Sequence, residues 1–339
     1  MSPAFAMHPD TRHGSASAAG PIVVRRTRSA NIEQHTEQLQ DWNLRYDQLD
    51  AGRFDGQFTD IRLPGMQIFV ESTSRRLRQR GELMADSLGV GTMLQGAGPL
   101  CVNGVRCDTD SLVACNATEL DMSTPLDCIL AGVVIDAAEL LDAARALDGM
   151  DRHFRHGWLV AMTPSDPVLA RWRQLLLDAV QAAVDPAGPL NDPVACQQLH
   201  DDLLLTLIDA MAGALREERV QRPDQRKRIV DRACELMLSH EDEPPSLFEV
   251  CRRVGASPRK LGYCFQDIFG VSPGRYIKTI RLNAVRRELC RAEDPRMSVY
   301  DAAARWGFWH FGHFSGDYKK LFAELPSETL NRARGLRTV

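Results

Sequence analysis

The stretch SLFEVCRRVGASPRKLGYCFQDIFGVSP, residues 246–273, is followed by a second stretch of the same pattern, SVYDAAARWGFWHFGHFSGDYKKLFAELP, residues 298–326. Gly255 corresponds to Gly307 at an offset of 52 residues, and the later apolar and proline positions correspond at an offset of 53. Each stretch predicts a short helix, a turn at the glycine and a second helix with one apolar face. We therefore predict two helix-turn-helix units, at about residues 246–270 and 298–322, which suit two successive segments of the DNA major groove.

In the first unit, Ser257 and Pro258 predict the start of the second helix, because serine caps a helix and proline fits its first position. The core side of this helix is apolar, so the opposite side is the candidate reading face. Arginine can pair with guanine and glutamine with adenine, while lysine and tyrosine reach phosphates. A glycine leaves room for close approach to the groove. The candidate DNA-binding residues are Arg259, Lys260, Gly262, Tyr263 and Gln266; the alternative is a solvated helix face.

In the second unit, the corresponding helix has a less basic outer side. Histidine and serine there are candidates for base edges, and Lys319 is placed for a phosphate. The alternative for the two histidines is a purely structural role. The candidates are His310, Phe311, Gly312, His313, Ser315 and Lys319. We expect the first helix to supply more of the direct base readout. A capped helix over residues 273–289, about 25 Å long, joins the two units.

The charge is unevenly divided along the 339 residues. The net charge of the whole chain is −4. Residues 223–339 contain 21 Lys and Arg against 15 Asp and Glu, and residues 1–222 contain 20 against 30. Such asymmetry indicates a basic binding domain attached to a different domain.

The preceding part of the chain predicts a second domain. Residues 1–28 are predicted to be a disordered leader without a signal-peptide core. Short alternating segments between about residues 54 and 135, with an Asn-Gly hairpin signal at 103–104, predict a small β-barrel or sandwich. Residues 136–218 predict helices, which either cover the barrel or form a dimer seam. Residues 29–222 thus form the predicted sensor or dimerisation domain, and residues 223–339 form the DNA-binding domain.

Several classes of site are disfavoured. Nine cysteines without a CxxC pair indicate reduced thiols in a cytoplasmic protein, and no apolar run is long enough for a membrane span. No histidine lies between Thr36 and Arg152, so the barrel lacks the usual ligands of a metal enzyme. We expect no metal, no cofactor and no enzymatic activity. Four cysteines lie in the predicted barrel: Cys101, Cys107, Cys115 and Cys128. They form a thiol sensor or a soft-metal cluster, or, as the alternative, they are ordinary buried thiols.

The C-terminal hundred residues resemble the AraC/XylS family of bacterial transcription regulators. The segments AAARWGFWHFGHFSGDYKKLFAELPSETL and SPGRYIKTIRLNAVRREL carry the resemblance. Within the family, their sequence is most similar to that of the ethanolamine-utilisation-regulator subgroup. It implies base-reading positions at Arg259, Gly262, Tyr263, Phe311, Gly312 and Ser315. Two of these are glycine and one is phenylalanine, and Ala323 stands where the family often has glycine. The resemblance also implies an upstream sensor domain, often a cupin-like β-barrel.

We therefore predict an α+β protein with an N-terminal cupin-like β-barrel and flanking helices, and a C-terminal all-α domain with two helix-turn-helix units joined by a long helix. The predicted function is that of a cytoplasmic, sequence-specific transcription regulator, an activator controlled by a small-molecule effector. Its expected partners are double-stranded promoter DNA, RNA polymerase and a second copy of the chain. No residue of the barrel is singled out as an effector ligand. The alternative is a ligand-binding or enzymatic barrel with an accessory DNA-binding domain.

Overall fold

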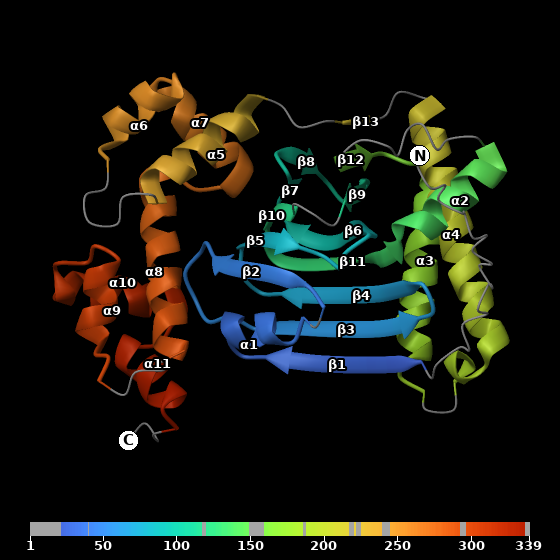
Figure 1. The fold of residues 1–339 in the computed structure, drawn as a ribbon, viewed down its shortest axis with the longest axis horizontal. Coiled ribbons are helices and arrows are strands. Elements are labelled where there is room, and N and C mark those ends of the chain that lie inside the picture. Colours follow the sequence, from blue (N-terminus) through green and yellow to red (C-terminus); the bar gives the residue numbers. More distant parts are fainter. Residues whose placement is uncertain are drawn as a thin grey trace, which may run out of the picture.

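The computed structural model describes residues 22–39, 41–116, 120–148, 159–185, 188–216, 220–221, 225–238, 245–291 and 296–335. The described residues form a β-rich N-terminal part covered by helices at one side and a helical C-terminal part at the other (Figure 1). The structure is therefore of the predicted α+β class, with strands and helices segregated along the chain.

Two antiparallel sheets make up the N-terminal part. The larger has the strand order β1-β3-β4-β11-β6-β9-β12-β13. Its strands are β1 (Val23–Ser29), β3 (Gly56–Leu63), β4 (Met66–Thr73), β6 (Ser87–Ala97), β9 (Leu112–Asn116), β11 (Leu126–Asp136), β12 (Leu159–Met162) and β13 (Val220–Gln221). The smaller has the order β2-β5-β10-β7-β8. Its strands are β2 (Asn43–Gln48), β5 (Leu77–Glu82), β7 (Leu100–Val102), β8 (Val105–Cys107) and β10 (Leu120–Thr124).

The larger sheet is buried on both faces. Along β11, Leu130 and Val134 pack toward the smaller sheet, whereas Ala131, Val133 and Ile135 pack toward the helices. Side chains alternate between the faces of a strand, so a strand buried on both faces is a nearly continuous apolar run. This explains why the alternation of hydrophobicity in the sequence is incomplete.

Helices cover the outer face of the larger sheet. They are α2 (Ala137–Asp148), α3 (Asp166–Ala182) and α4 (Pro193–Arg216), with the short 3-10 helix η2 (Pro189–Asn191) before α4. Trp172 and Leu176 of α3 and Leu203 of α4 belong to the same apolar cluster as Ile61 and Ile68 of the sheet. The buried sides of these helices therefore cover the sheet, one of the two roles that the sequence left open.

The C-terminal part consists of seven helices among the described residues. They are α5 (Gln225–Leu238), α6 (Leu247–Val254), α7 (Pro258–Phe269), α8 (Pro273–Arg291), α9 (Val299–Arg305), α10 (Phe311–Phe322) and α11 (Pro326–Ala333). Two apolar clusters lie along α8: one joins it to α5, α6 and α7, and the other joins it to α9, α10 and α11. The two turn glycines have the positive φ angles expected of them, 68° at Gly255 and 76° at Gly307.

The structure corrects three predictions. Strand β1 occupies Val23–Ser29, where a disordered leader was predicted up to residue 28; residues 1–21 lie outside the described part. This basic strand is ordered because it pairs along its length with β3, and Arg25 forms an ion pair with Asp60 at 3.2 Å. The cupin-like barrel is not closed, because among the described residues the strands pair within two separate sheets. The strands also extend beyond residues 54–135, since β2 and β12 lie outside that range.

A shorter helix lies between the first two strands. Helix α1 (Ile32–Glu37) is capped by Asn31, whose side chain accepts a hydrogen bond from the Gln34 backbone. It buries Ile32 and His35 against the sheets. Helix α1 places Glu33 next to Arg286 of the C-terminal part. It also places His35 next to Glu71 in the interior of the N-terminal part.

Candidate nucleic-acid interface

Helix α7 has a buried apolar side and a polar outer side, and both of its ends are capped. The Ser257 hydroxyl accepts a hydrogen bond from the Lys260 backbone at 3.2 Å, Pro258 occupies the first turn, and Gly270 ends the helix with φ of 66°. Ser257 and Pro258 are the signals that predicted the start of the helix, and the glycine end is a common C-terminal cap. The apolar side is buried, whereas four of the five candidate residues are exposed and Gly262 is half-buried: Arg259, Lys260, Gly262, Tyr263 and Gln266.

Arg259 and Tyr263 form one unit on this face. The Arg259 Nε donates to the Tyr263 hydroxyl at 3.1 Å, and the guanidinium lies 5.5 Å from the centre of the tyrosine ring. Tyr263 remains 58% exposed. The pairing holds the guanidinium above the helix surface while leaving its outer nitrogen atoms available, the arrangement that bidentate recognition of a guanine requires.

Helix α10 repeats the arrangement with different side chains. His310 at its N-terminus makes no side-chain cap, and Phe311 packs against Tyr300 and Phe314 with ring centres 6.1 and 5.7 Å away. Phe311 thus packs near the turn, whereas Trp309 is 64% exposed. The remaining candidates lie on the outer side of the helix; Ser315 is half-buried and the others are exposed: His310, Gly312, His313 and Lys319.

Three glycines lie on the outer faces of the two helices: Gly312 and Gly316 are exposed, and Gly262 is half-buried. A Cβ atom added at Gly262, Gly312 or Gly316 would meet no atom within 4 Å. Within a helix, glycine is about 1 kcal/mol less favourable than alanine, so these residues lower the stability of helices in which alanine would fit. No described neighbour occupies the space beside them. Glycine at such positions leaves room for close approach to the helix backbone.

Helices α7 and α10 are held by aromatic clusters on either side of α8. In the first, Phe269 stacks on Tyr276 with ring centres 4.5 Å apart, and Phe265 meets Tyr276 edge-on at 5.3 Å. In the second, Tyr318 packs on Phe322 at 4.7 Å. Helix α8 has 19 residues and is about 28 Å long, so it fixes both helices on one rigid element.

The C-terminal part of the chain is similar to known proteins. Residues 250–332 match a family model described as a helix-turn-helix domain. The crystal structure of a probable AraC family transcriptional regulator from Rhodopseudomonas palustris has 33% sequence identity to this chain, and the match covers 31% of this chain and 97% of that one, with a TM-score of 0.29. The chain belongs to the AraC/XylS family.

Two further AraC/XylS relatives are regulators by name. The probable thc operon regulatory protein of Rhodococcus erythropolis is 31% identical over 166 residues, which is 49% of this chain and 50% of the relative. The XylDLEGF operon transcriptional activator 1 of Pseudomonas putida is 37% identical over 78 residues, 23% of this chain and 24% of the relative. The chain thus spans about half the length of the first relative and about a quarter of the second.

An unpredicted contact joins the helical part of this AraC/XylS chain to its sheets. Strand β2 is the edge of the smaller sheet, and the side chain of Asn283 in α8 pairs with it. The Asn283 Oδ1 accepts from the Gln48 backbone N–H, and its Nδ2 donates to the Gln48 carbonyl oxygen, both at 2.9 Å. The amide therefore takes the place of a neighbouring strand and satisfies backbone groups that an edge leaves unpaired.

Buried charges flank this amide contact on α8. Arg287 donates to Asp47 of β2 at 2.6 Å, and Arg286 bridges Glu33 of α1 and Glu324, each at 2.5 Å. Burial alone would raise the pKa of Asp47, but the guanidinium groups, Arg287 first, hold it below its ordinary value. These contacts and the Asn283 pairing are together called the α8 latch below. Separating buried charges from their partners costs several kcal/mol. The α8 latch therefore fixes the position of the C-terminal helices relative to the sheets.

A second polar contact joins β5 to the start of the C-terminal part. Arg78 donates to both oxygens of Asp121, at 2.8 and 2.6 Å, and its guanidinium lies 4.6 Å from the centre of the Phe269 ring. It also donates to the Tyr276 hydroxyl. Lys227 of α5 reaches Asp121 at 2.9 Å. The aromatic cluster under α7 therefore rests directly on the smaller sheet. Sequence reasoning missed these residues because each partner is distant in the chain.

The four barrel-region cysteines are buried in the structure. Burial raises the pKa of the Cys101, Cys107 and Cys115 thiols to about 12 and raises that of Cys128 further. Neutral thiols are poor nucleophiles and poor metal ligands, so these side chains behave as apolar core residues. Among the described residues, no three His, Cys, Asp or Glu side chains gather in a group that suits a metal ion. No helix in the described ranges is both long and apolar enough to cross a bilayer.

Proposed function

We propose that this chain is a sequence-specific, DNA-binding transcription regulator that reads two major-groove segments with helices α7 and α10. The observation that carries the proposal is the pair of exposed helix faces with surface glycines, held on the common helix α8. In this proposal α6 with α7 and α9 with α10 each act as a helix-turn-helix unit. Arg259, Lys260 and Gln266 supply most of the base and phosphate contacts, and His310, Phe311, His313, Ser315 and Lys319 complete the interface.

The N-terminal part acts as the sensor in the same proposal. A small-molecule effector binds there, and its binding changes how the α8 latch presents the DNA-binding helices to promoter DNA in the cytoplasm. The outcome is activation of transcription through contact with RNA polymerase. In vitro transcription tests this by comparing the amount of transcript with and without effector. The relatives named as operon regulators and activators support this role.

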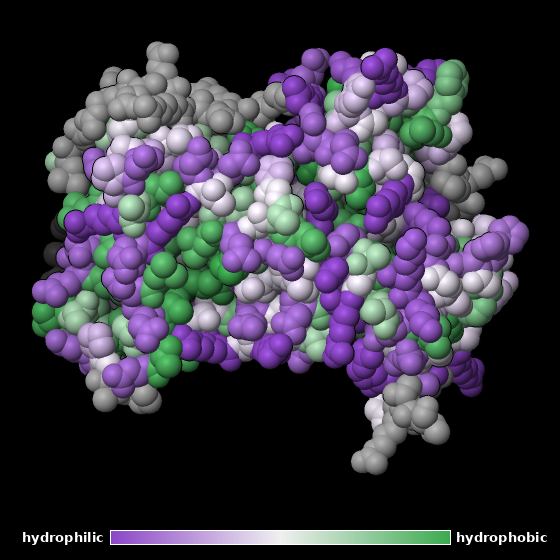
Figure 2. Space-filling view, turned by 180° about the vertical axis from the view of Figure 1, so that it is seen from behind, coloured by the Kyte–Doolittle hydropathy of each residue, from purple (hydrophilic) through white to green (hydrophobic). Residues whose placement is uncertain are grey.

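The protein acts as a homodimer in this proposal. The inner sides of α3 and α4 cover the sheet, but Leu177 and Leu205 on these helices remain 48% and 50% exposed. Hydrophobic side chains also gather into a continuous zone over the N-terminal part, whereas the C-terminal part is mostly hydrophilic on the face seen in Figure 2. Sedimentation of Leu177→Asp tests the seam: a variant that sediments as the wild-type dimer places the interface elsewhere.

DNA binding is tested with a site selected from a random duplex library by the wild-type protein. Fluorescence anisotropy compares wild type with the double variant Arg259→Ala, Lys319→Ala. The control is Arg145→Ala, Arg171→Ala, which removes the same charge from exposed positions on α2 and α3. We expect the first pair to weaken binding at least about tenfold and to reduce the salt slope by about 1 for each phosphate that the variant no longer neutralises. Equal binding by both double variants, or no enriched site, contradicts the proposal.

A further inference from the structure

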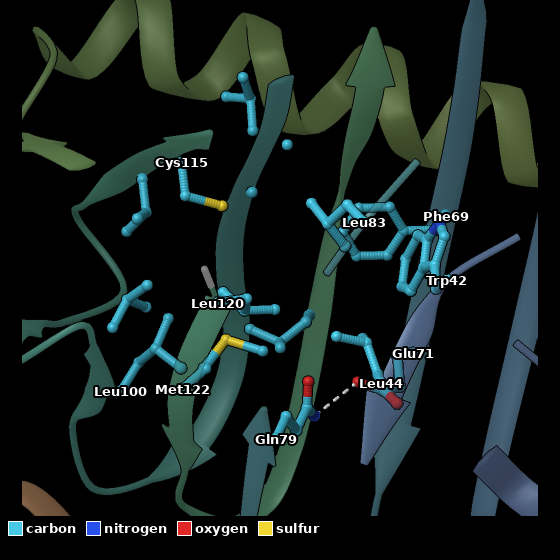
Figure 3. A pocket seen from close by; sticks show the side chains of 16 residues that line it. Trp42, Leu44, Phe69, Glu71, Gln79, Leu83, Leu100, Cys115, Leu120 and Met122 are labelled. Carbon is cyan, nitrogen blue, oxygen red and sulfur yellow. Dashed lines mark hydrogen bonds between the residues drawn. The ribbon is translucent and has the colours of Figure 1, made fainter. Parts of the chain in front are cut away.

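We propose that the space between the two sheets is the effector site, and that it takes a small, neutral, largely apolar molecule of at most one ring with a single hydrogen-bond donor, such as an alcohol or a phenol. This inference deepens the proposed function and rests on it. The space is a cavity of about 60 Å³. Residues from both sheets form its wall, so a bound molecule would contact both sheets (Figure 3).

The wall of the cavity is hydrocarbon over nearly its whole extent. Phe69 and Gly91 come from the larger sheet, Leu44 and Met122 from the smaller one, and Trp42 precedes β2. Among the described residues that line the cavity, the charged and amide side chains are Glu71 and Gln79 alone. An apolar cavity with few placed polar groups is the usual form of a small-molecule site.

The two polar side chains offer hydrogen-bond acceptors to the cavity. Glu71 Oε1 is within hydrogen-bond distance of His35 Nε2, at 2.9 Å, and accepts from the Tyr46 hydroxyl at 2.8 Å. Glu71 Oε2 accepts from the Gln79 amide at 3.0 Å. A carboxylate offers about four acceptor positions, so one remains on Oε2. In Figure 3 the Gln79 nitrogen is directed to Glu71 and its oxygen is directed away. A ligand hydroxyl or N–H matches the acceptors that remain.

The same set of groups disfavours charged ligands. An anion would enter beside the Glu71 carboxylate with no lining Lys, Arg or His to pair with it among the described residues. A cation would find a single open acceptor position, because the carboxylate oxygens already hold His35, Tyr46 and Gln79. Transfer of an ion from water into such a site costs several kcal/mol unless it gains a well-formed partner. A neutral molecule avoids this cost.

The volume limits the ligand to one ring. An engineered cavity of about 150 Å³ holds benzene, so a space of about 60 Å³ admits a ring only if its rim opens. The rim contains the half-buried side chains Trp42, Phe69 and Met122. Methionine adapts readily because its chain is unbranched and flexible. At Gly91, an added Cβ would lie 3.5 Å from the Ala131 carbonyl oxygen and 3.8 Å from the Phe69 ring, so a larger side chain there fits the backbone and fills the cavity.

Strand β2 connects this cavity to the DNA-binding part. Leu44 lines the cavity, and Tyr46 holds Glu71 from the same side of the strand. The next two residues, Asp47 and Gln48, make the contacts of the α8 latch with Arg287 and Asn283. A ligand that moves Leu44 or the Tyr46–Glu71 pair therefore acts on a strand whose other end holds α8, which gives both sites one shared structural element.

The test uses the full chain and three probes with one carbon framework: benzyl alcohol, benzylammonium and benzoate at pH 7. Binding is measured by isothermal titration calorimetry on wild type, on Gly91→Val and on the control Gly213→Ala, a helix position in α4 where a Cβ meets no atom within 4 Å. We expect benzyl alcohol to bind wild type and Gly213→Ala equally, at least tenfold more tightly than either ion, and to bind Gly91→Val at least tenfold more weakly. If Gly91→Val does not fold, Met122→Trp at the rim replaces it.

Tighter binding of either ion, equal binding of benzyl alcohol to both cavity and control variants, or no binding of benzyl alcohol to wild type overturns the inference. DNA affinity is measured on the same samples without ligand. Intact DNA binding together with any of these results rejects the ligand class alone, whereas loss of sequence-specific DNA binding by wild type rejects the proposed function.

Discussion

Replacement of Gly262 by alanine should stabilise the free protein and weaken its complex with DNA. Gly262 lies in the interior of α7, and the added Cβ would meet no atom within 4 Å. Alanine is favoured over glycine in a helix interior by about 0.8–1.0 kcal/mol, so the free energy of unfolding should rise by about this amount. The substitution leaves every polar side chain of α7 in place, which separates close backbone approach from side-chain readout.

The effect on DNA binding should have the opposite sign. A methyl group inserted into a closely packed contact costs about 1–3 kcal/mol, which corresponds to a rise in Kd of roughly 5- to 150-fold. Fluorescence anisotropy on the selected DNA site and urea denaturation of the free protein measure the two effects on the same samples. Gly213→Ala in α4 is the matched control, because its Cβ also meets no neighbour and it lies outside the C-terminal helices.

Two results would refute this reasoning. If Gly262→Ala binds DNA as tightly as wild type while gaining stability, the glycine does not serve close approach and α7 does not lie with this face in the groove. If Gly262→Ala and Gly213→Ala weaken DNA binding equally, the loss reflects a general effect of stabilisation. A decrease in stability for Gly262→Ala would show that the open space at this position is filled in solution.

Three further outcomes follow from the fold. Asn283→Ala should lower the free energy of unfolding in urea by about 2–4 kcal/mol, because the N–H and carbonyl of Gln48 lose their buried partner; a decrease below about 1 kcal/mol contradicts the pairing. Ala323 ends α10 at a positive φ of 57°, so Ala323→Gly should raise the free energy of unfolding by about 1 kcal/mol, and an unchanged urea midpoint would contradict the strain. The lowered pKa of Asp47 means that its stabilising contribution is full above the unfolded-state pKa of about 4 and is lost as the pH falls through the folded-state value; the stability difference between wild type and Asp47→Asn should therefore shrink from pH 7 to pH 3, and a difference that grows would reverse the sign.

The C-terminal helices could be predicted in detail because their signals are local. Ser257 and Pro258 mark the start of α7, and Gly270 marks its end, within a span of 14 residues. The same holds for Ser298, whose side chain and Asp301 form a capping box at the start of α9. Caps, turns and apolar spacing act between neighbouring residues, so the sequence shows them directly.

The sheets were predicted less completely because strand pairing is not local. Strand β4 and the hairpin of β7 and β8 follow from their own alternation and from the Asn-Gly turn, where Asn103 and Gly104 have positive φ. Strand β1 carries three arginines, a composition that suggests exposure, and is ordered only because β3 pairs with it. Strand β12 follows a helix and joins the sheet beside the much earlier strand β9, where Leu159 pairs with Cys115.

The sequence by itself determined the repeated helix pairs, their outward residues and the basic balance of the C-terminal part, because short-range backbone preferences and residue charge are properties of the chain itself. Only the tertiary structure decided how these helices are held. In the sequence, Asn283 is one polar residue of the helix that became α8, and Gln48 is the last residue of a strand. The hydrogen bonds between them join positions that are 235 residues apart, so no local pattern predicts them. The cavity is decided in the same way, since two separate sheets enclose it and Glu71 becomes its polar end only when His35, Tyr46 and Gln79 converge on that carboxylate.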